Sequence, residues 1–216
     1  IMPLLFGLVG AGVLAWLGAW QLQRLDWKRA VLSDISARIQ ADLVDLPADV
    51  SPGRDQYLPV TVVGAFVGQE VHVLASRKRY GAGYRVISVF VVGERRVLVD
   101  RGFMAIDAKN TPRPGKAAQL TGNLHWPDKT DAYTPAPDLA ANICFARDVE
   151  RLACALGTER VLIVARSDTA DSIRPFPVST TAIPNDHLGY AITWFLLALV
   201  WLGMTGKLAW RINRRI

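Results

Sequence analysis

Two long runs without charge, one at each end of the chain, constrain this protein most. Residues 1–23 and 188–206 contain no Asp, Glu, Lys or Arg, so the runs are 23 and 19 residues long. About 20 consecutive apolar residues in a helix cross the hydrocarbon core of a bilayer. Both runs are therefore predicted to be transmembrane helices, and they account for much of the 51% hydrophobic content of the chain.

A cleaved secretory signal is the alternative interpretation of the first run. The apolar core of a signal peptide covers only about 7–15 residues, and this longer run has no convincing small-x-small cleavage site near its end. We therefore expect an uncleaved anchor. Because residue 1 is Ile, we also expect the natural N-terminus to precede it.

Most of the net charge of +6 lies in the residues that follow the second run. Lys207, Arg211, Arg214 and Arg215 supply +4, which leaves +2 for residues 24–186. A basic cluster beside a transmembrane end marks the cytoplasmic side. Both termini are thus predicted in the cytoplasm (or the mitochondrial matrix), with the central domain on the other side. The small remaining charge argues against nucleic acid as a partner.

Small residues recur every fourth position in the first run, at Gly7, Ala11, Ala15 and Ala19. Such stripes permit close packing of helices in lipid. The second run is the expected partner, although another subunit could use the same stripe.

Apolar residues continue at a spacing of four beyond the first run, at Trp27, Val31, Ile35 and Ile39. This pattern predicts an amphipathic helix that lies on the domain.

The middle of the chain has the pattern of a β-rich domain. Short β-branched and aromatic runs alternate with Gly or charged turns. These runs are Tyr57–Val67, Glu70–Ala75, Tyr84–Val92, Arg95–Phe103, Ala117–Trp126, Asn142–Arg147 and Val161–Arg166. One short helix is expected at Asp148–Leu156, closed by Gly157. The predicted fold is a pair of transmembrane helices flanking a soluble antiparallel β-barrel or sandwich with one short helix.

The predicted organisation has five parts. Residues 1–23 form the first transmembrane helix, and 24–46 its amphipathic helical extension. Residues 47–186 form the β-rich domain on the non-cytoplasmic side. Residues 187–207 form the second transmembrane helix, and 208–216 a basic cytoplasmic tail.

The central domain holds both cysteines, Cys144 and Cys154. A disulfide is possible in an oxidising compartment, but with a strand and a helix expected between them we favour buried thiols. Their spacing fits no zinc or Cys-x-x-Cys-His haem pattern.

Catalytic motifs are absent from the sequence: it has no Gly-x-Ser-x-Gly, P-loop or dinucleotide pattern. His72 and His125 fall in predicted strands without a neighbouring ligand, which favours structural roles. The turn Gly81–Gly83, flanked by Arg77 and Arg85, is interpreted as a solvated basic turn, with anion binding as the alternative. We therefore expect a protein that is not an enzyme.

His187 differs from the other histidines because it stands where the second run begins, after Asn185 and Asp186. Either of these two residues is expected to cap the helix. An ionisable residue at membrane depth is costly and often functional, but an interfacial polar residue needs no function. The residues alone leave these two interpretations equal.

A functional His187 has a clear chemical rationale. Neutral imidazole is a good axial ligand for haem iron, and an apolar setting keeps it neutral. On the same helix face, Ala191 and Ala198 would leave space for a flat macrocycle, while Tyr190 and Trp194 would offer aromatic surface.

An ordered set of short motifs resembles the surfeit locus protein 1 family across nearly the whole chain. The motifs are Gly18–Lys28, Tyr57–Val60, Gly64 and Phe66, Gly81, Gly83 and Tyr84, Val99–Phe103, Gly122–Leu124 and Asn185–Phe195. The last motif, Asn-Asp-His-Leu-Gly-Tyr-Ala-Ile-Thr-Trp-Phe, is the most specific.

The resemblance implies an assembly factor for haem-a-type cytochrome c oxidase. It implies that His187 is the iron ligand for haem a, and that oxidase subunit I is the partner, with haem a synthase as a further candidate. The implied location is the bacterial inner membrane with the domain in the periplasm, or the mitochondrial inner membrane in a eukaryote. Many relatives have Asn where this chain has Asp186 and Asp100; a carboxylate beside His187 favours protonated imidazole and is expected to weaken iron binding.

The alternative function is a membrane scaffold without cofactor that stabilises immature subunit I. In that case His187 is only an interfacial residue, and the small-residue stripe with the Arg77–Arg85 loop would carry the contacts.

Overall fold

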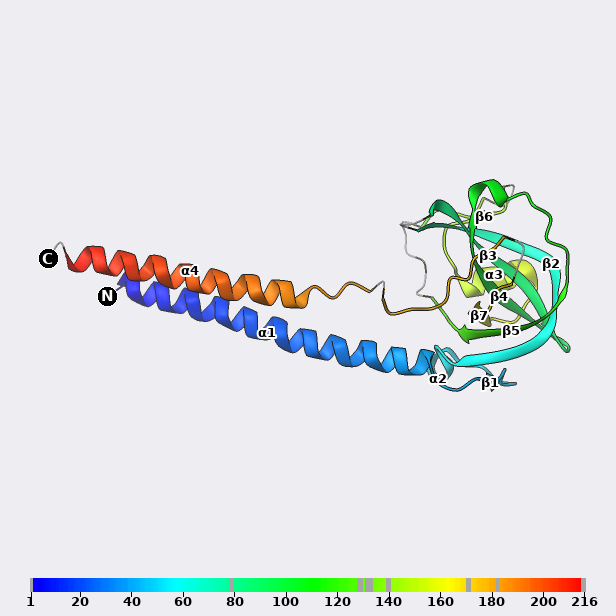
Figure 1. The fold of residues 1–216 in the computed structure, drawn as a ribbon, viewed down its shortest axis with the longest axis horizontal. Helices are drawn as coiled ribbons and strands as arrows, with labels where there is room; N and C mark the ends of the chain where they lie inside the picture. Colours follow the sequence, from blue (N-terminus) through cyan, green and yellow to red (C-terminus); the bar gives the residue numbers. More distant parts are fainter. Residues whose placement is uncertain are drawn as a thin grey trace. The chain divides into compact units, whose positions relative to one another are not determined.

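The computed structural model describes residues 2–77, 80–127, 130, 134–138, 141–169, 172–181 and 183–214. The chain divides into two compact units. One comprises the residues up to Ile35 together with those from Thr180 onward, and the other comprises Ser36–Ser179. The first is the helical unit and the second is the β domain (Figure 1).

The helical unit consists of α1 (Met2–Ile39) and α4 (His187–Asn213), which lie side by side (Figure 1). Both are long and apolar enough to cross a membrane, with mean hydropathies of 1.9 and 1.7 over their most apolar windows. Only 17% and 11% of those windows are buried, so neither is the core helix of a globular domain. This apolar exposed surface is suited to lipid.

The C-terminal ends of α1 and α4 differ from the boundaries expected from the sequence. α1 ends at Ile39 rather than at residue 46, and Trp27 and Val31 of its predicted amphipathic stripe are exposed. α4 continues past residue 207 to Asn213, so the first part of the basic tail is helical.

Three close contacts show that α1 and α4 pack antiparallel. A Cβ atom added to Gly7 would meet Thr205, one on Gly10 would meet Trp201, and one on Gly18 would meet Phe195. Small residues on α1 thus let the helices approach closely, and the second span is the partner of the small-residue face. The predicted small-residue stripe was only partly right. Its last member, Ala19, is exposed, and Gly18, which the stripe did not include, is buried.

The β domain contains seven strands and three short helical elements among its described residues. The strands are β1 (Val44–Asp45), β2 (Pro59–Arg77), β3 (Gly81–Val92), β4 (Arg95–Ala105), β5 (Ala117–Leu124), β6 (Ile143–Cys144) and β7 (Leu162–Ala165). The helical elements are α2 (Pro52–Asp55), the 3-10 helix η1 (Ile106–Ala108) and α3 (Val149–Leu156). The expected helix at Asp148–Leu156 is therefore confirmed, but it is not the only one.

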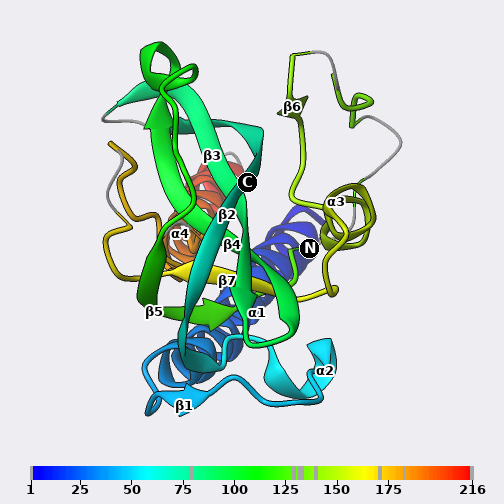
Figure 2. The ribbon, with the colours of Figure 1, turned by 90° about the vertical axis from the view of Figure 1, so that its right-hand side faces the viewer.

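The sheet is mixed, so the expectation of a purely antiparallel domain was wrong. Strands pair in the order β1-β2-β3-β4-β7-β5, and β5 pairs again with β2. The pairings β1–β2, β2–β6 and β4–β7 are parallel. β5 and β7 lie side by side in the view of Figure 2. The polypeptide between β4 and β7 includes β5, β6 and α3, which gives enough length for a parallel return.

A single bent strand, β2, replaces the two strands expected at Tyr57–Val67 and Glu70–Ala75. Its first half pairs with β5 and its second half with β3. The register against β3 shifts between Phe66 and Glu70, where Gly68 has φ +78°. A bulge at this glycine bends the strand without ending it.

The core of the domain lies between the strands and under α3. Val149, Leu152 and Ala153 of α3 pack with Leu98 of β4 and Leu162 of β7. Asp148 caps α3 by accepting a hydrogen bond from the Arg151 N–H, and Gly157 ends it in the left-handed conformation. Fixing α3 in this way closes one side of the sheet.

Both cysteines are free thiols, as expected, but the expectation that both are buried was right for Cys144 only. Cys144 is buried on β6, and burial raises the pKa of its thiol. Cys154 is exposed on α3.

Candidate functional site

His187 is the first residue of α4 and is half-buried in the helical unit. Its Nδ1 lies 2.8 Å from Oε1 of Gln21 on α1. Within the described part of the chain, His187 Nε2 has no hydrogen-bond partner. One ring nitrogen is thus held by the neighbouring helix, and the other is available to a ligand.

The segment before His187 is tied to α1 a second time. The Lys28 ammonium donates a hydrogen bond to the Pro184 carbonyl oxygen. Asp186 occupies the N-cap position, but its side chain makes no capping hydrogen bond, so the expected capping role was wrong. Asn185 Oδ1 is buried without a hydrogen-bond partner in the described structure. Contacts with α1, rather than a side-chain cap, therefore fix the start of α4.

The structure separates the residues expected to surround a haem. Ala191 is 1% exposed and Ala198 is 7% exposed, so both lie inside the helix contact. Trp194 is half-buried on the same face, whereas Tyr190 is 59% exposed. The alanines thus let the helices approach each other, and only Tyr190 leaves an aromatic surface open beside His187.

These residues fit a single axial ligand to haem iron. His187 presents an unpartnered Nε2, which is the donor that iron requires. No group of three or more His, Cys, Asp or Glu side chains gathers to hold a metal ion among the residues that the structure describes. A porphyrin would have to lie on the outer, exposed side of the helix pair, since the inner face is packed.

The motif Val99–Phe103 supports the domain rather than a ligand site. Asp100 is fully buried and accepts hydrogen bonds from Arg85 (2.7 Å), Arg147 (3.2 Å) and the Gly102 N–H (3.1 Å). Gly102 has φ +121°, and a Cβ atom there would lie 2.1 Å from the Arg174 carbonyl oxygen. Both residues are thus required by packing at this point of β4.

Asn123 forms hydrogen bonds to three distant parts of the domain. Its amide nitrogen donates to the carbonyl oxygens of Ile39 (3.1 Å) and Tyr57 (2.8 Å), and its Oδ1 accepts from Arg166 (2.6 Å). The Gly122–Leu124 motif therefore fixes the end of α1 and the start of β2.

His72 and His125 have structural partners, as the sequence indicated. His72 is 5% exposed, and its Nε2 lies 2.8 Å from Glu70, which also accepts from Arg113 at 2.8 Å. Burial alone would raise the pKa of Glu70, but the hydrogen bonds from His72 and Arg113 outweigh it and lower that pKa below its ordinary value. His125 stacks on Tyr57 with ring centroids 5.6 Å apart.

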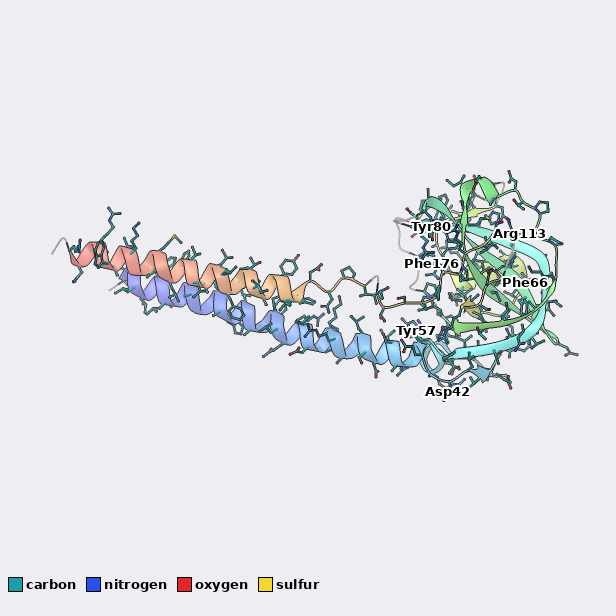
Figure 3. The ribbon with its side chains drawn as sticks, in the orientation of Figure 1. Asp42, Tyr57, Phe66, Tyr80, Arg113 and Phe176 are labelled. Carbon is teal, nitrogen blue, oxygen red and sulfur yellow. The ribbon has the colours of Figure 1, made fainter. Side chains whose placement is uncertain are left out.

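Arginines and aromatic rings alternate at the turn after β2. Arg77 lies over the Phe176 ring at 4.1 Å, and Arg85 lies over the same ring at 4.3 Å. Arg174 lies over Tyr80 at 4.5 Å. Figure 3 shows Tyr80 and Phe176 close together on the domain. Residues 78–79 of this basic turn lie outside the described residues, and its anion-binding alternative stays untested.

The fold and the site define a class of protein: two apolar helices, paired with each other, that flank a mixed-sheet domain and carry a histidine where the second helix begins. Residues 8–199 match the SURF1 family, so this chain belongs to that family. It is 30% identical over 199 residues to the SURF1-like protein of Rickettsia bellii, covering 86% of this chain and 82% of the relative. It is 27% identical over 209 residues to Surfeit locus protein 1 of Homo sapiens, covering 84% and 69%.

Gln21 is the residue of the site that the sequence analysis did not single out. It belongs to the motif Gly18–Lys28, and it lies three residues after Gly18 and four before Leu25, both of which are buried. A spacing of alternating threes and fours marks the inner face of a helix pair. That spacing places the polar residue Gln21 on this face.

Proposed function

We propose that this protein is an assembly factor for haem-a-type cytochrome c oxidase, which binds haem a through His187 and assists its insertion into oxidase subunit I. Membership of the SURF1 family supports the assembly role, because that family is known for it. The observation that carries the haem proposal is the free Nε2 of His187 at the start of an apolar helix.

The arrangement suits cargo that must be released. Haem a supplies an iron with open axial positions, and His187 offers it one nitrogen. Since His187 is the one ligand proposed here, departure would require the loss of one bond to the protein. The apolar surface of α4 would keep the porphyrin at lipid depth. The protein would then act in the bacterial inner membrane, with both termini cytoplasmic and the domain periplasmic.

Haem content of the purified chain tests this proposal. The protein is purified from cells with haem a synthesis on or off, and haem per polypeptide is measured from the absorption spectrum. We expect haem a in the wild type and its loss in His187→Ala. His125→Ala is the matched control, since it removes an imidazole from the domain. Equal haem content in wild type and His187→Ala would refute the proposal.

One observation favours the alternative of a scaffold without cofactor. Ala191 and Ala198, the positions expected to accommodate the macrocycle, are buried in the helix contact. The exposed outer faces of α1 and α4 would then hold immature subunit I directly. This function predicts a colourless protein and capture of subunit I that survives His187→Ala.

A further inference from the structure

Gln21 is the one polar side chain on the inner face of α1 between Gly7 and Leu25. The inner face of this helix follows alternating spacings of four and three residues, and up to Leu25 it consists of Gly7, Ala11, Leu14, Gly18, Gln21 and Leu25. A polar group in an apolar helix contact is costly unless it is hydrogen-bonded. The partner of Gln21 is His187, and their side chains are 166 residues apart in sequence.

This contact bears on which ring nitrogen of His187 carries the proton. The contacting atom of Gln21 is its amide oxygen, which can only accept a hydrogen bond. The Nδ1–H of His187 must therefore donate it. In neutral imidazole the lone pair then lies on Nε2, the nitrogen that has no partner in the described structure.

We infer that Gln21 is a positioning residue, which holds His187 in the Nδ1–H tautomer and aims Nε2 away from the helix pair. This inference rests on the proposed function, because the orientation is useful only if Nε2 binds iron. Partners that hold the second nitrogen of a ligating histidine set its orientation and its basicity. A carboxylate that accepted the hydrogen bond from Nδ1–H would make the neutral imidazole a stronger ligand through Nε2, unlike a carboxylate that favours protonation of Nε2. The neutral amide of Gln21 keeps the iron bond weak enough to break.

The tautomer is measured without any haem. The full-length protein is labelled with 15N-histidine in detergent micelles, and the ring nitrogens of His187 are assigned by comparison with His187→Ala. At a pH where the ring is neutral, we expect a protonated Nδ1 and an unprotonated Nε2. In Gln21→Leu we expect a mixture of the two tautomers. Gln23→Leu is the matched control, because Gln23 is exposed on the same helix two residues away.

The strength of the iron bond is measured with ferric haem b as the probe. We expect Gln21→Leu to bind it about 10–100-fold more weakly, the usual effect of removing such a partner. Gln21→Glu is expected to bind more tightly and to lower the haem reduction potential. Gln23→Leu should match the wild type. Since Gln21→Glu keeps a polar partner for His187, it also tests the idea if Gln21→Leu does not fold.

A failure of the role inferred for Gln21 can be told apart from a failure of the proposed haem-binding function. A protonated Nε2 in the wild type, or unchanged tautomer and haem affinity in Gln21→Leu and Gln21→Glu, would overturn the role of Gln21. Undiminished haem binding by His187→Ala would overturn the proposed function while leaving the tautomer result intact.

Discussion

Gly7 of α1 faces Thr205 of α4 so closely that a Cβ atom on Gly7 would lie 2.1 Å from Thr205 Cγ2. Gly12 lies five residues further along α1, and a Cβ atom added to it would have no other atom within 4 Å. The two glycines thus report the two sides of the helix, one packed against α4 and one facing outward.

Gly7→Leu is expected to weaken the helix pair, because the added side chain has no space against Thr205. Overpacking of a tight contact costs about 1–3 kcal/mol. The measurement is the SDS fraction at which the purified protein unfolds in mixed micelles, followed by tryptophan fluorescence. Gly12→Leu should leave that midpoint unchanged. Equal midpoints for the two variants would contradict the packing described for α1 and α4.

Asp100→Asn should strongly destabilise the β domain. Asp100 is fully buried and balances Arg85 and Arg147, so its loss leaves two guanidinium groups without a counter-charge. Removing the charge of one partner of a buried ion pair costs about 3–5 kcal/mol of stability. Thermal unfolding of the full-length protein measures the loss.

The control for Asp100 is Glu159→Gln, which breaks the exposed pair with Arg95. Exposed pairs contribute about 0–1 kcal/mol, so its unfolding temperature should stay close to that of the wild type. A loss as large as that of Asp100→Asn would show that burial is not the deciding factor.

The lowered pKa of Glu70 predicts a pH-dependent contribution to stability. Glu70 releases its proton more readily in the folded protein than in the unfolded chain. Its contribution is therefore complete above its ordinary pKa of 4.5 and is lost as the pH falls through the lower, folded value. We expect the stability difference between wild type and Glu70→Gln to shrink across that acidic window. Chemical unfolding at several pH values measures it, and a difference that grows on acidification would contradict the assignment.

The sequence predicted both long helices, because charge-free runs of this length have few other uses. It was less accurate about the face by which they pair. A repeat of four residues advances about 400° on a helix, so the stripe from Gly7 to Ala19 turns away by about 120°. The buried face follows alternating threes and fours, which replaces Ala19 with Gly18 and brings in Gln21.

The β-rich character of the domain was also predictable, but its topology was not. Short β-branched and aromatic runs between turn residues indicated most strands, including β3 and β4. Nothing local shows that β7 pairs with β4 in parallel, or that one strand bends at Gly68 to contact both β3 and β5. Such pairings depend on contacts between residues far apart in the sequence.

At the candidate site, the sequence singled out His187 and was interpreted as leaving space for a macrocycle at Ala191 and Ala198, whereas α4 uses both alanines to pack against its neighbour helix. A helix face that could receive a flat ligand could equally receive another helix, and only the pairing decides between them.

The most direct test of the account is whether the imidazole of His187 bonds to haem iron. The protein is labelled with 15N-histidine and loaded with ferric haem a, and pulsed EPR measures hyperfine coupling between the iron spin and ring nitrogens. We expect coupling to one 15N-imidazole in the wild type and none in His187→Ala. Coupling that persists in His187→Ala, or that is missing from the haem-loaded wild type, would contradict it.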